Sequence, residues 1–182
     1  DVYKRQLNKQ REIIYTQRSQ VLDGEDLHAS ILNMMHELAV ESVNNYLLDD
    51  EDRDNWNLIG LKDHFLGWVL RDEDLDYSDD QLEEIKKADV VKLLEDRMLE
   101  IYSAKEAEFG GELIRELERV ILLKVVDTKW MNHIDDMAEL KKGIGLRAFG
   151  QKNPVVEYRY EGFEMFDAMV EAIREDTVRM LL

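Results

Sequence analysis

Apolar side chains recur at alternating spacings of three and four residues in the last third of the chain. Seven such positions line one face of a predicted long helix: Leu123, Val126, Trp130, His133, Met137, Leu140 and Ile144. A second series follows Pro154, at Phe163, Phe166, Val170, Ile173, Thr177 and Met180. Two striped helices joined by a short loop bury their apolar faces by folding back on each other. The pattern predicts an antiparallel helical hairpin, with Val126, Trp130, His133, Met137, Leu140, Phe163 and Phe166 packed inside it.

The turn of this hairpin is basic. Gly143 and Gly145 interrupt the stripe where helix is costly. Asn153 and Pro154 then begin the second helix as N-cap and first helical residue. A glycine-containing basic tip, at about residues 143–153, can contact phosphates, acidic protein or an extended polypeptide, although an ordinary turn would have the same sequence. The candidate contact residues at and beside the tip are Lys141, Lys142, Gly145, Leu146, Arg147, Phe149, Gln151 and Lys152.

The rest of the chain also predicts helices and no sheet. Apolar spacing indicates helices at residues 8–22, 26–48, 58–69 and 79–87, then one with Asp89 as its N-cap that runs to about Phe109. Ser78 and Gln81 have the spacing of a capping box. Gly110 and Gly111 leave two alternatives open, a break or a bend before the long helix from Glu112 to about Lys142. With a single proline and few glycines, the chain is predicted to be all-α.

Charge divides the chain into three parts. The formal net charge is −17, and residues 23–109 alone have a net charge of −17, from 8 basic and 25 acidic side chains. Residues 1–22 have a net charge of +3 and residues 110–182 of −3. We therefore predict domain boundaries after residues 22 and 109. The acidic block repels nucleic acid and anionic lipid; it indicates either a face for a basic partner or a well-solvated surface.

Motifs for catalysis are absent from the sequence. The four histidines form no HExxH pattern, there is no GxxxxGK[ST] phosphate loop, and there is no cysteine. Gly143 and Gly145 follow a helix and not a strand, so they are not a dinucleotide fingerprint. His133 lies on the packing stripe, where a hydrogen-bonded histidine is favoured over a metal ligand. We expect no catalytic residue, metal site or cofactor in this chain, and we hold a metal-dependent or acid/base enzyme as the least favoured class.

The chain resembles a known family, both in the predicted hairpin and in the first predicted helix. Residues 125–154, VVDTKWMNHIDDMAELKKGIGLRAFGQKNP, closely resemble the two-helix finger of SecA, the ATP-driven motor of bacterial protein export. QREIIYTQR, Gln10–Arg18, resembles the helical scaffold that precedes the wing domain in that family. The resemblance runs from about Asn8 to Leu182 and does not include Asp1–Gln6.

The resemblance implies a different structural role for each of the three parts of the chain. Residues 1–22 would end a scaffold helix, residues 23–109 would form the acidic helical wing, and residues 110–182 would complete the scaffold and form the finger. In the family the finger tip enters the mouth of the SecYEG channel and contacts the translocating preprotein, and the same hairpin restrains ATP hydrolysis. Phe149 stands where the family often has tyrosine, an aromatic residue implicated in moving the chain. The nucleotide-binding domains, which use ATP and Mg, have no counterpart in this sequence.

The implied partners are an unfolded preprotein, the SecYEG channel and those nucleotide-binding domains, with no nucleic acid, and a homodimer is left open. The implied location is the cytoplasm and the inner face of the bacterial cell membrane, with peripheral attachment only. A different class of function is the alternative: a stand-alone acidic helical adaptor that binds a basic protein partner.

Overall fold

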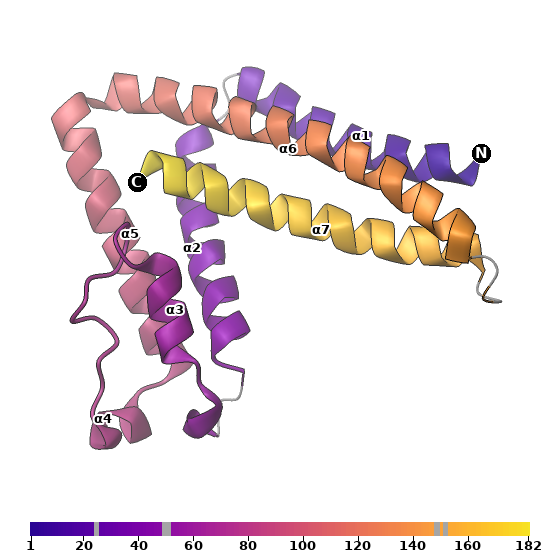
Figure 1. Ribbon diagram of the computed structural model, residues 1–182. Coiled ribbons are helices and arrows are strands. Elements are labelled where there is room, and N and C mark those ends of the chain that lie inside the picture. Colours follow the sequence, from indigo (N-terminus) through magenta and orange to yellow (C-terminus); the bar gives the residue numbers. More distant parts are fainter. Residues whose placement is uncertain (24–25, 49–51, 148–149, 151–152) are drawn as a thin grey trace. The chain divides into compact units, whose positions relative to one another are not determined.

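The computed structural model describes residues 1–23, 26–48, 52–147, 150 and 153–182, and of Arg147 the backbone alone. Within these ranges the regular elements are helices, apart from one isolated bridge between Leu66 and Leu70, and the predicted all-α class is confirmed (Figure 1). They are α1 (Val2–Leu22), α2 (Leu27–Tyr46), the short 3₁₀ helix η1 (Arg53–Asn55), α3 (Leu58–Phe65), α4 (Asp79–Glu84), α5 (Lys87–Phe109), α6 (Gly111–Arg147) and α7 (Pro154–Leu181).

The chain divides into two compact units. Residues 1–27 and 118–177 form the first, which we call the hairpin unit, and residues 28–117 and 178–182 form the second, which we call the acidic unit. The charge pattern predicted three parts, with boundaries after residues 22 and 109. In the structure the chain passes from one unit to the other after residues 27 and 117. Helices α6 and α7 each contribute residues to both units.

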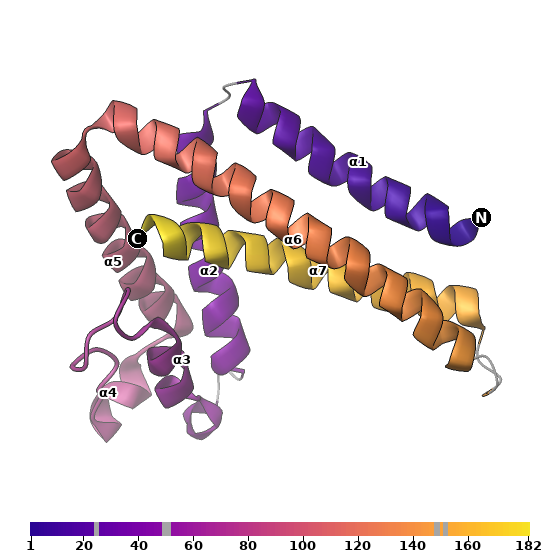
Figure 2. The same cartoon turned by 45° about the horizontal axis from the view of Figure 1, so that its top comes forward.

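In the acidic unit, α2 and α5 lie antiparallel and side by side (Figures 1 and 2). His28 stacks on Tyr102 with ring centroids 5.8 Å apart, and His36 Nδ1 lies 2.8 Å from Glu95 Oε2. The core between the helices consists of fully buried apolar side chains: Ile31, Met35, Val43, Val90, Leu94 and Met98. Helix α3 adds Leu61 and Phe65, which are fully buried as well. The acidic unit therefore has a hydrophobic core of its own.

Helix ends in this unit confirm one prediction and correct two. Ser78 and Gln81 form the predicted capping box at the start of α4. The N-cap of α5 is Lys86 and not Asp89; the Asp89 carboxylate instead accepts the Lys86 backbone N–H at 2.9 Å, because it lies one turn into the helix. Helix α3 ends at Phe65, short of the predicted residue 69, because the chain turns back there and Leu70 N–H donates to the Phe65 carbonyl at 2.9 Å.

The two glycines after α5 break the helix. Gly110 has φ 88°, a conformation that residues with a Cβ rarely adopt, and it caps α5 by donating its N–H to Glu106 O at 2.8 Å. Helix α6 begins at the next residue, Gly111. An Arg115–Glu106 ion pair of 2.5 Å spans the junction. Of the two alternatives left by the sequence, the structure therefore has the break.

In the hairpin unit, α6 and α7 lie side by side in both views, and α1 completes a three-helix arrangement (Figures 1 and 2). Helix α6 continues through Gly143 and Gly145 to Arg147, so the prediction that helix ends near Lys142 is wrong. Ile144, between the glycines, is 1% exposed and belongs to a cluster with Met137, Leu140 and Tyr158. Burying such a side chain contributes about 1.5–3 kcal/mol, which offsets the roughly 1 kcal/mol that each glycine costs in a helix.

Candidate functional site

The helical hairpin formed by α6 and α7 is the candidate functional element, and its inner stripe lies where the periodicity placed it. Six of the seven α6 positions are buried: Val126, Trp130, His133, Met137, Leu140 and Ile144. Leu123 is half-buried. From α7, Phe166 is 8% exposed and its ring meets the His133 ring edge to face, with centroids 5.9 Å apart. The stripe thus forms one continuous packed seam along α6.

Phe163 is a correction, because it is 54% exposed. Its neighbour Gly162 occupies the buried face instead, where a Cβ would lie 2.9 Å from the Met137 methyl group. A Cβ there would also meet the Gln6 amide nitrogen, so a larger residue would require the Gln6 and Met137 side-chain ends to shift. The next residue, Phe163, points about 100° away around the helix. Within the hairpin unit, the buried positions of α7 are Tyr158, Gly162, Phe166, Met169, Ile173 and Thr177. Met180, in the predicted series, is 48% exposed.

A buried hydrogen-bond chain connects the three helices at the level of His133. The Nε2 atom of His133 donates to Gln10 Oε1 at 2.6 Å, and Gln10 Nε2 donates to the Gly162 carbonyl at 3.2 Å. Gln10 is 2% exposed and His133 3%. Burial lowers the pKa of His133, and the negative charge of Asp136 opposes this only in part. The ring is therefore neutral at neutral pH, and it acts as a structural hydrogen-bond donor.

The sequence reasoning missed Gln10, since a glutamine among charged residues carries no apolar signal. It lies four residues before the buried Ile14, on the same face of α1. This spacing is the one feature of the sequence that places Gln10 toward the hairpin.

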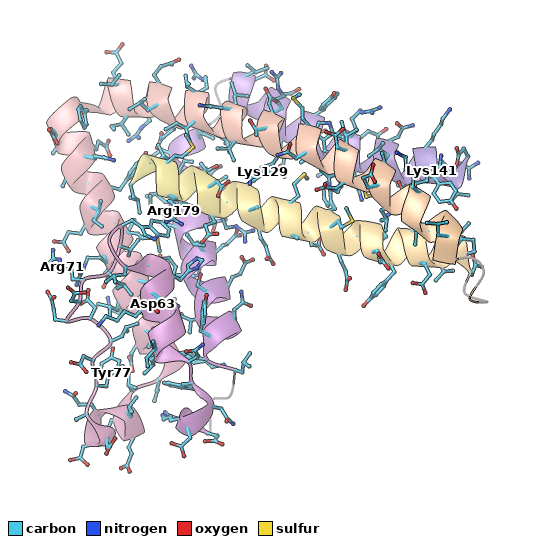
Figure 3. All side chains as sticks on the ribbon, viewed as in Figure 1. Asp63, Arg71, Tyr77, Lys129, Lys141 and Arg179 are labelled. Carbon is cyan, nitrogen blue, oxygen red and sulfur yellow. The ribbon has the colours of Figure 1, made fainter. Side chains whose placement is uncertain are left out.

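Ion pairs also join the helices nearer their surface. Arg18 Nε on α1 lies 2.9 Å from Asp127 Oδ1 on α6, and the Asp127 carboxylate raises the pKa of Arg18. Lys129 Nζ on α6 lies 2.9 Å from Asp176 Oδ2 on α7 (Figure 3). These side chains are 31–48% exposed, so each pair adds little stability and mainly fixes the register of neighbouring helices.

The free end of the hairpin is basic and exposed to solvent. The side chains of Lys141 and Lys142 are 52% and 76% exposed, and Leu146 is 74% exposed. Lys142 Nζ lies 3.4 Å from Glu139 Oε1, and Lys141 Nζ lies 3.9 Å from Asp1 Oδ2. Gly145 is exposed too. Phe149, Gln151 and Lys152 lie outside the described residues, as does the side chain of Arg147.

This arrangement can transmit motion or make contacts, and we find no catalytic constellation in it. Among the residues that the structure describes, no group of three or more histidine, aspartate or glutamate side chains is placed to hold a metal ion. Within the same ranges, no helix is long and apolar enough to span a bilayer. What the geometry provides is a long, packed pair of helices whose basic end is exposed.

Comparison with known proteins agrees with this description. The family model of the SecA wing and scaffold domain matches residues 2–182. Protein translocase subunit SecA of Acetivibrio thermocellus is 46% identical over 176 residues, which is 97% of this chain and 19% of that protein. Protein translocase subunit SecA of Clostridium botulinum is 51% identical over 180 residues, covering 96% of this chain and 21% of that protein.

A scaffold-and-wing module is thus the class that the fold and the comparisons define. The chain spans about a fifth of the length of the curated relatives it matches. The chain belongs to the SecA wing and scaffold domain family. The resemblance seen in the sequence is confirmed, and the match begins at residue 2, earlier than the resemblance did.

Proposed function

We propose that this chain is the scaffold, wing and two-helix finger portion of a SecA-like translocation motor. In this role α6 and α7 couple the ATP-driven motion of nucleotide-binding domains outside this chain to the movement of a preprotein through the SecYEG channel. The observation that carries the proposal is the hairpin itself: a seam packed as far as Ile144 that ends in exposed Lys141, Lys142 and Leu146. A packed lever can move its end without bending, and an exposed basic end is free to contact a partner.

The proposal places chemistry and mechanics in different parts of the protein. ATP and Mg would be bound by the motor domains, and the hairpin would restrain hydrolysis by contacting them. The protein would work in the cytoplasm, attached peripherally at the inner face of the cell membrane, and a homodimer is compatible with it. The stand-alone adaptor is less well supported, because the relatives are about five times longer than this chain.

The tip provides the test. In a complete SecA subunit carrying this chain's hairpin, we expect Phe149→Ala to impair transport of a preprotein into vesicles while ATP binding persists. Phe149→Tyr should be tolerated, because the aromatic ring is retained. Met131→Ala is the matched control, since Met131 is 67% exposed on α6 and lies away from the tip. Transport by Phe149→Ala equal to that of the control would remove the tip from the mechanism.

Charge at the tip can be tested separately. Replacing Lys141, Lys142 and Arg147 with glutamate should weaken docking on the channel, and the loss should be larger at low salt. The isolated chain should not be stabilised by nucleotide, because it has no phosphate loop and only a ligand that binds the folded state raises its stability.

A further inference from the structure

The acidic unit contains a groove that the finger mechanism does not use. It has a volume of about 450 Å³ and lies where the chain leaves α3, and Ile101 of α5 also lines it. A tight turn builds it. Val69 and Leu70 both donate their N–H groups to the Phe65 carbonyl, at 3.0 and 2.9 Å. Gly67, inside this turn, has φ 88°.

Contacts with neighbouring residues fix the position of Trp68 in the apolar wall of the groove. The Trp68 indole N–H donates to the His64 carbonyl at 2.8 Å, and its ring stacks on that of the fully buried Phe65, with centroids 5.2 Å apart. The guanidinium of Arg179 lies over the Trp68 ring at 5.0 Å. Leu66, by contrast, is 40% exposed. Leu66, Trp68 and Ile101 therefore form a preformed apolar surface that a ligand can reach.

The rim of the groove is charged, and it is the charge that identifies an occupant. Arg71, Asp72 and Glu73 line the groove and are exposed (Figure 3 labels Arg71). Two more cations touch the lining: Arg179 lies over the Trp68 ring, and the Lys62 ammonium donates to the Asp72 carbonyl, so the rim itself has mixed charge and the negative field comes from the rest of the unit. The next acid, Asp74, is already neutralised, because Arg97 donates to both of its carboxylate oxygens at 3.0 and 3.1 Å. The whole acidic unit holds 24 acidic and 10 basic side chains, a net charge of −14. An acidic ligand would be repelled by this field, and a cationic one attracted.

We propose that this groove binds an extended, basic peptide segment. One aliphatic side chain of the segment packs against Leu66, Trp68 and Ile101, while lysine or arginine residues on either side of it contact Asp72 and Glu73. The apolar wall provides the short-range contact, and the surrounding negative charge accelerates the encounter. The site is separate from the hairpin, so it stands or falls independently of the proposed function.

The experiment is a calorimetric titration of the 182-residue chain with a capped synthetic peptide of alternating lysine and leucine. We expect Leu66→Lys to weaken binding about tenfold or more, because it removes the apolar contact and adds a like charge. Ile59→Lys is the matched control, since Ile59 is 77% exposed on α3, lies outside the groove, and the substitution adds the same charge to the same unit. Its affinity should stay within about twofold of the parent.

A second variant tests the rim without touching the apolar wall. Replacing Asp72 with asparagine and Glu73 with glutamine keeps the shape of two exposed side chains, and it should weaken binding and reduce its dependence on salt. Three results would overturn the proposal. They are equal losses in Leu66→Lys and Ile59→Lys, equal binding of a peptide with serine in place of leucine, and self-association of the chain that Leu66→Lys abolishes. The last would mean that a second copy occupies the groove.

Discussion

The middle of the α6–α7 hairpin and its free end belong to the same two helices but differ in burial. In the middle, Trp130, His133 and Phe166 are at most 8% exposed, and a side chain from α1 joins them. At the end, Lys142 and Leu146 are about three-quarters exposed. The difference indicates that the middle fixes a geometry while the end remains available to a partner. Substitutions should therefore affect stability in the middle and interactions at the end.

Trp130→Ala should have the largest effect on the middle. Trp130 is 5% exposed and its ring lies against His133, with centroids 5.5 Å apart, so truncation leaves a large void. We expect the free energy of unfolding to decrease by about 3–5 kcal/mol. Chemical denaturation followed by circular dichroism measures this without relying on the lost indole. A decrease below about 1 kcal/mol would place Trp130 at a surface, and it would contradict the claim that the middle of the hairpin is a packed core.

Trp130→Phe offers a finer comparison at the same position. Within the described residues the Trp130 indole Nε1 is buried without a hydrogen-bond partner, so phenylalanine loses volume but also removes an unsatisfied donor. Its cost should therefore be well below that of alanine.

Gln10→Ala should have the next largest effect. It leaves the Nε2–H of His133 buried without its partner, and an unsatisfied buried group costs about 1–3 kcal/mol. Gln17→Ala is the matched control, because Gln17 is exposed on the same helix. Equal unfolding free energies for the two variants would show that the hydrogen-bond chain contributes nothing to stability.

His133 should give the middle of the hairpin a pH dependence. Its pKa is lowered in the folded state, so the unfolded state takes up a proton below the ordinary value of 6.5 while the folded state does not. The unfolding free energy should decrease as the pH falls from about 7.5 to about 5.5, and this decrease should be smaller in His133→Gln. Equilibrium denaturation of both proteins across this range makes the comparison; parallel pH profiles would contradict it.

The smallest effect on stability is expected at the free end. Lys142→Glu should change the unfolding free energy by no more than about 0.5 kcal/mol, because its side chain is 76% exposed and its ion pair with Glu139 is a surface pair. Thermal or chemical denaturation is sufficient as a readout. A loss comparable to that of Gln10→Ala would mean that the end is part of the core after all.

Predictions from the sequence succeeded where one physical signal dominated. The α6 stripe from Val126 to Ile144 was found because every member is large and apolar except His133, and the period is that of a helix. The all-α class followed in the same way.

The errors arose where the signal depended on a neighbour in space. Phe163 was placed in the seam because it is apolar, but Gly162 takes the buried position, against the side-chain ends of Gln6 and Met137. Gly143 and Gly145 indicated a helix end by propensity alone, and the burial of Ile144 outweighed it. The apolar wall of the groove was not predicted either. Leu66 and Trp68 lie in the turn at Gly67 and Ile101 lies on α5, so only the folded chain brings them together.

The Gln10 contacts also bear on the order in which the hairpin unit assembles. Gln10 is 123 residues from His133 and 152 from Gly162 along the chain, and Arg18 is 109 from Asp127. Loop closure costs entropy that rises with the logarithm of loop length, whereas α6 and α7 are joined by a short turn and can meet early. During synthesis, α1 leaves the ribosome long before either of its partner helices exists. It must wait for the hairpin to form, with Ile14 exposed until the hairpin covers it.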